Sequence, residues 1–226
     1  MLSTNSVWSR TEANPSELIS ERLYNLTIGA VLLWGFALNY AIVQSLDPIW
    51  LVNAVPYWGL LIGYIVSTIA GTMIYTSSDN PWVSFFGYNL IVVPIGVILT
   101  PFLYQFDALL IQRALTATGG VTVGMMMLSG AFPSFFLGLG RTLFLALILG
   151  VISQVVMMFF FRGSYNPSMF DWGFVVIFSG YIGYDWARAN AIPKTFDNAV
   201  DSAASLYLDI INLFIRILRV LGRSRD

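Results

Sequence analysis

Five long stretches without a charged residue constrain this chain more than any other feature of its sequence. A helix needs about 20 mostly apolar residues to cross the hydrocarbon core of a bilayer. Open sheet edges do not survive in lipid, and the sequence has no alternating ten-residue strand pattern. We therefore expect five membrane-spanning helices, one in each of the charge-free runs, which are 23–46, 48–78, 80–106, 114–140 and 142–161.

The composition favours a polytopic membrane protein and excludes several kinds of site. Of the 226 residues, 57% are hydrophobic and 10% are charged, whereas a soluble domain is about 25% charged. The chain has no cysteine and no histidine, which excludes disulfides, thiolate or histidine metal sites and Ser-His-Asp catalysis. Its net charge of −1 provides no basic surface for nucleic acid. The partner that remains is the lipid bilayer.

The ends of the chain carry most of its charge. Residues 1–22 contain both arginines and acids, and the apolar stretch that follows is too long for a signal peptide, so we expect a polar N-terminal tail. Residues 23–222 are expected to form a single seven-helix membrane domain, followed by a basic tail at 223–226. Basic residues precede the first span and are then missing until Arg113, which favours a cytoplasmic N-terminus. We expect the plasma membrane of a prokaryote.

Beyond residue 162 the apolar runs are too short to span a bilayer unless they include a carboxylate. The run 172–184 has to continue through Asp185 to about Asn190, and the last segment has to include Asp209. A carboxylate at the centre of a spanning helix costs about 2.5–3.5 kcal/mol, so two of them in consecutive helices indicate a function. Seven full spans would place the C-terminal arginines outside, whereas six spans and a re-entrant last helix would keep them inside. The sequence leaves both topologies open.

One face of the last helix is polar. Its polar residues recur at spacings of three and four, which is the helical period. Such a helix either lies on the membrane surface or packs among the spans with its polar face toward the protein interior. A second intramembrane carboxylate at 185 favours the interior. The polar stripe consists of Asp201, Ser205, Asp209, Asn212, Arg216, Arg219 and Arg223.

Asp185 and Asp209 would lie at comparable depth if the last two helices form an antiparallel hairpin. Two like charges about 4 Å apart, at an effective dielectric near 20, repel by roughly 4 kcal/mol, so such a pair keeps one proton toward neutral pH. Sharing that proton draws the helices together, and its loss pushes them apart or admits a cation. Alternatively, each aspartate bonds separately to a tyrosine, the backbone or an arginine; the candidate arginines are Arg113, Arg141 and Arg188.

Three segments carry a family resemblance. The string GYIGYD occupies 180–185, LYLDIINLFIRILRVLG occupies 206–222, and IQRALTATGGVTVGMMMLSG occupies 111–130. The first two resemble the closing signature of the transmembrane Bax inhibitor motif family, and the third is similar to that family's fourth helix. The resemblance covers nearly the whole chain. It implies an all-α fold of seven transmembrane helices, in which the C-terminal helix is surrounded by the other six.

The resemblance also implies a function, that of a pH-sensitive calcium leak channel whose proton-sensing pair maps to Asp185 and Asp209. Carboxylates suit calcium, a hard cation that takes oxygen ligands, and two of them would make a weak site for a permeating ion. No other cofactor is expected. The chain departs from the family in one respect, because relatives can latch the sixth-helix aspartate with an arginine on the second helix, whereas the run 48–78 has no charge.

Two other classes of function compete with a channel. A non-conducting regulator or scaffold would use the same pair to sense pH or calcium. An intramembrane aspartyl protease also uses a Tyr-Asp on one helix, as at Tyr184-Asp185, and an aspartate on the next. That class needs Gly-Leu-Gly-Asp around the second aspartate, whereas this chain has Leu-Tyr-Leu before Asp209. We therefore do not expect an enzyme.

Overall fold

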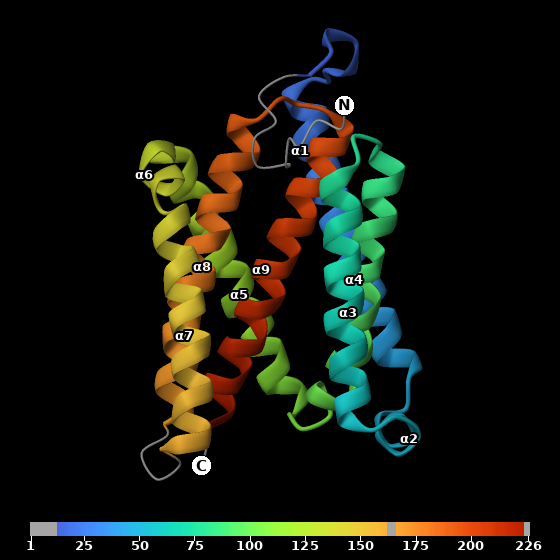
Figure 1. Ribbon diagram of the computed structural model, residues 1–226, viewed down its shortest axis with the longest axis vertical. Coiled ribbons are helices and arrows are strands. Elements are labelled where there is room, and N and C mark those ends of the chain that lie inside the picture. Colours follow the sequence, from blue (N-terminus) through green and yellow to red (C-terminus); the bar gives the residue numbers. More distant parts are fainter. Residues whose placement is uncertain (1–12, 162–165, 224–226) are drawn as a thin grey trace. The chain divides into compact units, whose positions relative to one another are not determined.

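The computed structural model describes residues 13–161 and 166–223, which are almost entirely helical (Figure 1). Most of the expected N-terminal tail and residues 224–226 of the expected C-terminal tail lie outside the described residues. Two α-helices in the described part are short, α2 (Pro48–Ala54) and α6 (Pro133–Gly138), and a 3-10 turn covers Pro15–Glu17. The long helices are α1 (Glu21–Ser45), α3 (Tyr57–Ser77), α4 (Pro81–Leu103), α5 (Ala108–Ala131), α7 (Gly140–Phe160), α8 (Pro167–Ala191) and α9 (Phe196–Arg223).

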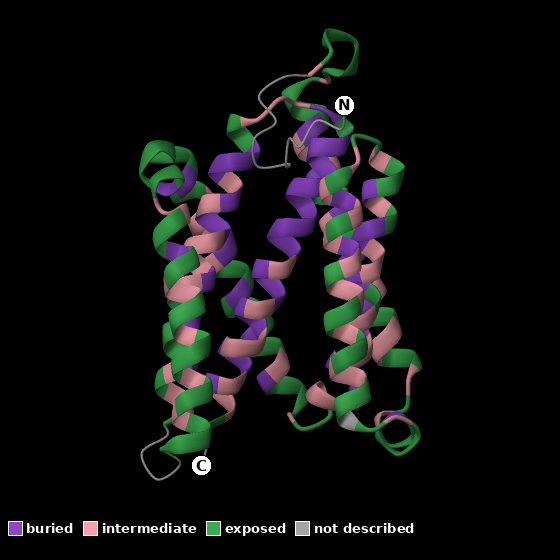
Figure 2. Cartoon of the chain, viewed as in Figure 1, coloured by how far each residue is buried: buried purple, intermediate pink, exposed green. Residues whose placement is uncertain are grey.

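Five of these helices are long and apolar enough to cross a membrane, namely α1, α3 from Trp58 onward, α4, α5 and α7. Large apolar side chains are exposed along them, and many residues of α3 and α7 are coloured green, as exposed, in Figure 2. In water such surfaces would be unfavourable, whereas lipid covers them without cost. The expectation of an all-α, polytopic membrane protein with five strongly apolar spans is confirmed.

Prolines and aspartates set helix boundaries that differ from the expected runs. Asp47 caps α2 by accepting hydrogen bonds from the backbone N–H groups of Ile49 (2.7 Å) and Trp50 (3.1 Å). Pro56 then separates α2 from α3, because proline disfavours a helical conformation in the residue before it. The run 48–78 therefore contributes its span from residue 57 onward.

The fourth span begins and ends earlier than its charge-free run. Asp107 caps α5 by accepting a hydrogen bond from the backbone N–H of Leu110 (2.8 Å), so the helix starts at Ala108 and includes Arg113. It ends at Ala131, because Pro133 lacks the N–H that a continuing helix would need. The helix therefore starts before the charge-free run 114–140 and ends within it, at the turn-forming residues Gly130 to Pro133.

The last two helices follow the pattern that their charges required. α8 continues through Asp185 to Ala191, and α9 runs for 28 residues without a break. Every residue of α9 from Asp197 to Gly222 is buried or half-buried (Figure 2). A helix lying on a membrane surface would bury its apolar face alone, so this burial argues against the surface interpretation of the polar stripe.

The chain divides into two compact units, and α9 contributes to both. Unit 1 comprises Met1–Gln105 and Ala191–Tyr207, and unit 2 comprises Phe106–Asn190 and Leu208–Asp226. In unit 1, α3 and α4 cross where two glycines face each other, since a Cβ built on Gly71 would lie 2.5 Å from the carbonyl oxygen of Gly87. The candidate site lies in unit 2.

Candidate functional site

Asp185 of α8 and Asp209 of α9 come together inside unit 2. Their carboxyl groups lie close enough together to interact electrostatically with each other. Both residues are buried, with 7% and 8% of their surface exposed. Two buried carboxylates in such proximity repel each other, which favours a state in which one of them holds a proton. The structure thus brings together the two aspartates that the sequence singles out.

Few groups in the described part of the chain face this pair. The Nη1 atom of Arg188 lies 3.7 Å from Oδ1 of Asp185, and this arginine is itself only 9% exposed. Tyr181, one turn before Asp185 on α8, is close enough to interact electrostatically with both carboxyls. Within the described residues, Oδ1 of Asp185 and Oδ2 of Asp209 are buried without a hydrogen-bond partner. The pair therefore has one cation beside it and unused acceptor oxygens.

The two other candidate arginines lie elsewhere. Arg113 is exposed near the start of α5, and Arg141 is exposed at the start of α7. Neither forms an ion pair with an aspartate in the residues that the structure describes. Of the three candidates, Arg188 is the one that the structure places beside the pair.

The glycines of the GYIGYD string allow α8 to approach its neighbours closely. A Cβ on Gly180 would lie 2.7 Å from Leu143 of α7, and one on Gly183 would overlap the ring of Phe136 in α6. The hydroxyl of Ser129 in α5 donates to the carbonyl oxygen of Gly183 at 2.6 Å. These contacts fix the turn of α8 that carries Asp185.

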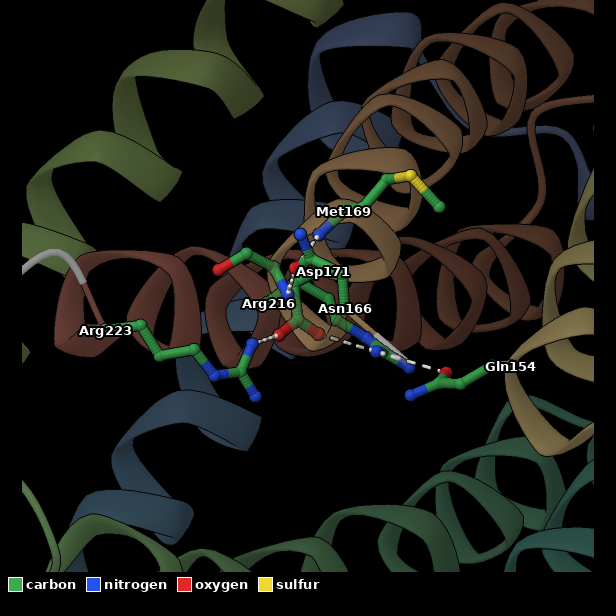
Figure 3. Close-up of polar contacts among 7 residues, drawn as sticks. Gln154, Asn166, Met169, Asp171, Arg216 and Arg223 are labelled. Carbon is green, nitrogen blue, oxygen red and sulfur yellow. Dashed lines mark hydrogen bonds and ion pairs between the residues drawn. The ribbon is translucent and has the colours of Figure 1, made fainter. Parts of the chain in front are cut away.

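The C-terminal part of the polar stripe forms ion pairs with a carboxylate that was not predicted from the sequence. Arg216 donates to Oδ1 of Asp171 at 2.8 Å, and Arg223 donates to Oδ2 of the same residue (Figure 3). Asp171 is only 1% exposed. Asn212, by contrast, donates to the carbonyl oxygen of Leu208 in its own helix at 2.8 Å. A signal was present, since Asp171 precedes Asp185 by four helical turns and so shares its face.

The N-terminal part of the stripe, which contains Asp201 and Ser205, is buried in unit 1. It belongs to a polar cluster at the start of α9, in which Ser84 donates to Oδ1 of Asp197 at 2.7 Å. Lys194, in the loop before α9, lies over the ring of Tyr24. Burial lowers the pKa of Lys194 below its ordinary value, and Glu21 opposes that shift. This part of the stripe belongs to unit 1, whereas the aspartate pair belongs to unit 2.

The described residues offer limited means of holding a metal ion. No group of three or more His, Cys, Asp or Glu side chains in 13–161 and 166–223 is placed to hold one. Asp185 and Asp209 supply two carboxyl groups, whereas calcium takes six to eight oxygen ligands. Water and backbone carbonyls would have to provide the others.

Comparison with known proteins identifies the family of this chain. A family model described as inhibitor of apoptosis-promoting Bax1 matches residues 17–226. A Helicobacter pylori protein described as uncharacterised is 26% identical over 204 residues, which are 88% of this chain and 80% of that protein. The BI1-like protein of Arabidopsis thaliana is 39% identical over 87 residues, or 38% of this chain and 33% of that protein.

A third relative, from Streptococcus pyogenes, is named as a membrane protein and is 30% identical over 137 residues, covering 57% of this chain and 58% of its own length. None of these three relatives carries the name of an enzyme. The family match extends over nearly all of the described residues and includes both helices of the aspartate pair. The chain is a multi-pass membrane protein of the Bax inhibitor-1 family.

Proposed function

We propose that this protein is a pH-sensitive cation leak channel, with calcium as its favoured ion, gated by protonation of the Asp185–Asp209 pair. One observation carries the proposal, namely the proximity of two buried carboxyl groups on consecutive helices. A hydrogen bond between them can exist only while the pair holds a proton. Protonation therefore controls whether the pair attracts or repels the helices that carry it.

The position of Arg188 favours one arrangement of charge and proton. Because its guanidinium lies beside Asp185, the negative charge is best placed on Asp185 and the proton on Asp209, which then donates the hydrogen bond. Loss of that proton leaves two anions and one cation in a buried site. Repulsion of roughly 4 kcal/mol between carboxylates about 4 Å apart then favours separation of α8 and α9. We expect cation flux to rise with pH.

The chemistry of the pair favours calcium as the permeating ion. Oδ1 of Asp185 and Oδ2 of Asp209 are acceptors without hydrogen-bond partners in the described part of the chain. Hard divalent cations prefer such oxygen ligands. Two carboxylates are too few for tight binding, so an ion that replaces the proton is able to leave again. Weak binding of this kind suits a leak.

The test is calcium flux into liposomes that contain the purified protein, measured between pH 6 and pH 8. Wild-type flux should rise by up to about tenfold per pH unit, because one proton is lost per opening. Asp209→Asn cannot ionise but still donates to Asp185, so its flux should stay low and nearly constant. Asp47→Asn is the matched control, because it removes one exposed negative charge and asparagine caps α2 equally well.

Two results would contradict this proposal. If Asp209→Asn keeps the wild-type pH profile, the pair does not gate the pathway. If folded wild-type protein carries no calcium at any pH, the chain does not conduct, and the pair would serve a non-conducting regulator that senses pH or calcium.

A further inference from the structure

A second charged contact joins α8 and α9 away from the proposed gate. One buried carboxylate, that of Asp171, accepts hydrogen bonds from both Arg216 and Arg223 of α9 (Figure 3). Arg216 also donates to the side-chain oxygen of Gln154 in α7 at 3.5 Å. Asp171 is almost fully buried, while the side chain of Arg223 keeps 39% of its surface exposed. The attraction at this contact is therefore strong and only partly screened by solvent.

The two contacts lie in a matching register. Fourteen positions separate Asp171 from Asp185 on α8, and fourteen separate Asp209 from Arg223 on α9. Fourteen residues are about 21 Å of helix and nearly four full turns, so each pair of positions shares one face of its helix. The antiparallel helices α8 and α9 therefore contact each other at two levels. At one level two carboxyl groups meet, Asp185 and Asp209, and at the other the carboxylate of Asp171 meets the guanidinium of Arg223.

Aromatic side chains of α8 occupy the interval between these two levels. The guanidinium of Arg216 lies 4.0 Å from the ring centre of Phe174, which stacks on Phe178 at 6.2 Å. Phe178 in turn lies 6.5 Å from Tyr181, the tyrosine that faces the aspartate pair. Phe174 and Phe178 are buried. This row of rings excludes water from the interval, which strengthens the electrostatic interactions at its ends.

We infer that Asp171, Arg216 and Arg223 form an electrostatic tether that fixes the register of α9 against α8 and holds these helices together when the Asp185–Asp209 pair carries two negative charges. Asp171 is thus a positioning residue for the pair. The inference rests on the proposed function only in taking that pair to be the group that ionises. When the pair repels, the helices separate at its level while the tether keeps them joined about 21 Å away.

The charged groups at each level determine where pH acts. The tether's carboxylate faces Arg216 and Arg223, and guanidinium groups stay protonated at every pH of interest. The pair faces Arg188 and Tyr181 on α8. The repulsion that the tether opposes therefore increases as the pair loses its proton, and the tether should matter more at high pH than at low pH.

The test measures thermal unfolding of the purified full-length protein in nanodiscs at pH 5.5 and pH 8. Asp171→Asn leaves the half-buried Arg216 without its counter-charge, and should lower the unfolding midpoint by roughly 6–20 °C. The loss should be greater at pH 8 by at least about 3 °C. In the Asp185→Asn/Asp209→Asn background the pair cannot ionise, so the loss should be equal at both pH values. Asp47→Asn is again the matched control.

A milder variant keeps the test decisive if Asp171→Asn does not fold. Arg223→Gln removes the more exposed guanidinium and should show the same pH difference at smaller size, whereas Arg223→Lys keeps the charge and should retain most of the stability. Equal losses at both pH values in the otherwise wild-type chain would overturn the tether. Because unfolding requires no flux, a channel assay that fails while the pH difference persists would overturn the proposed function alone.

Discussion

In the proposed gate, Arg188 determines which of the two buried carboxyls carries the negative charge. It lies three residues after Asp185 on the same helix, so a single turn of α8 holds both an anion and its cation. Asp209 has no such neighbour on its own helix, because the next arginine, Arg216, is engaged with Asp171. The proton therefore belongs on Asp209. We expect Arg188 to take the role that the family resemblance assigns to an arginine of the second helix.

If the protein conducts as proposed, replacement of Arg188 should move the pH response of the flux. Without the guanidinium, a second negative charge at the pair is harder to create, so Arg188→Gln should shift the rise in calcium flux upward by about 1–3 pH units. Arg188→Lys keeps the charge and should stay close to wild type. Arg113→Gln removes an exposed arginine and should leave the midpoint unchanged. A profile for Arg188→Gln that coincides with wild type would show that this cation does not act on the pair.

The residues that sequence reasoning located and those that it missed differ in a physical way. Asp185 and Asp209 interrupt apolar segments that must be complete to span a membrane, so each is conspicuous in its own segment. Asp171 stands beside a turn-forming stretch, where an exposed aspartate is ordinary. Its burial depends on Arg216 and Arg223, which lie 45 and 52 residues further along the chain. A pattern of neighbouring residues cannot predict an ion-pair partner that is so far away in the sequence.

Helix α8 is held by small residues placed opposite large ones. Gly183 accommodates the ring of Phe136, and Gly180 accommodates Leu143. The GYIGYD string therefore provides close helix packing as well as Asp185. Helices in membranes associate largely through such close approaches. By contrast, a Cβ on Gly173 of the same helix would meet nothing within 4 Å. The two positions therefore make opposite predictions for the same substitution.

Gly183→Ala should destabilise the protein by about 1–3 kcal/mol, because the new methyl group overlaps the Phe136 ring and forces α6 or α8 to shift. Gly173→Ala should be neutral or stabilise by up to about 1 kcal/mol, since alanine favours the helix and meets no neighbour. Unfolding midpoints in detergent would compare the two variants. Adding Phe136→Leu to Gly183→Ala should recover part of the loss. Equal effects of the two glycine substitutions would refute this account of the α6–α8 contact.

Helix boundaries show why the spans were easier to predict than their ends. The number of apolar helices can be predicted because any long charge-free run has enough apolar residues to cross the hydrocarbon core. The ends follow from single side chains, such as Pro56, which divides the second run, and Asp107, which starts α5 ahead of the charge of Arg113. An arginine near a helix end is tolerated in a membrane because its head group extends toward water. Charge-free runs therefore locate the spans but not their ends.

The topology of the whole chain depends on how the C-terminal arginines are counted. The positive-inside tendency concerns basic residues in loops near span ends. Arg216 and Arg223 lie within α9 and are bonded to the buried carboxylate of Asp171, so they do not act as free loop charges. Without these two arginines, fewer basic residues count against seven crossings, which would place the C-terminus outside. The uninterrupted α9 is about 42 Å long, which exceeds the hydrocarbon thickness of a bilayer.

We therefore expect the two ends of the described chain to lie on opposite sides of the membrane. The protein contains no cysteine, so single cysteines introduced as Glu17→Cys, Asp79→Cys and Ser224→Cys report position without further changes. A membrane-impermeant maleimide applied to intact cells should label position 224, whereas positions 17 and 79, separated by two spans, should react only after permeabilisation. Labelling of positions 17 and 224 from the same side would mean that α9 enters and leaves by one face. In that case α9 would be a re-entrant helix that brings Asp209 to Asp185, and the chain would cross the membrane six times.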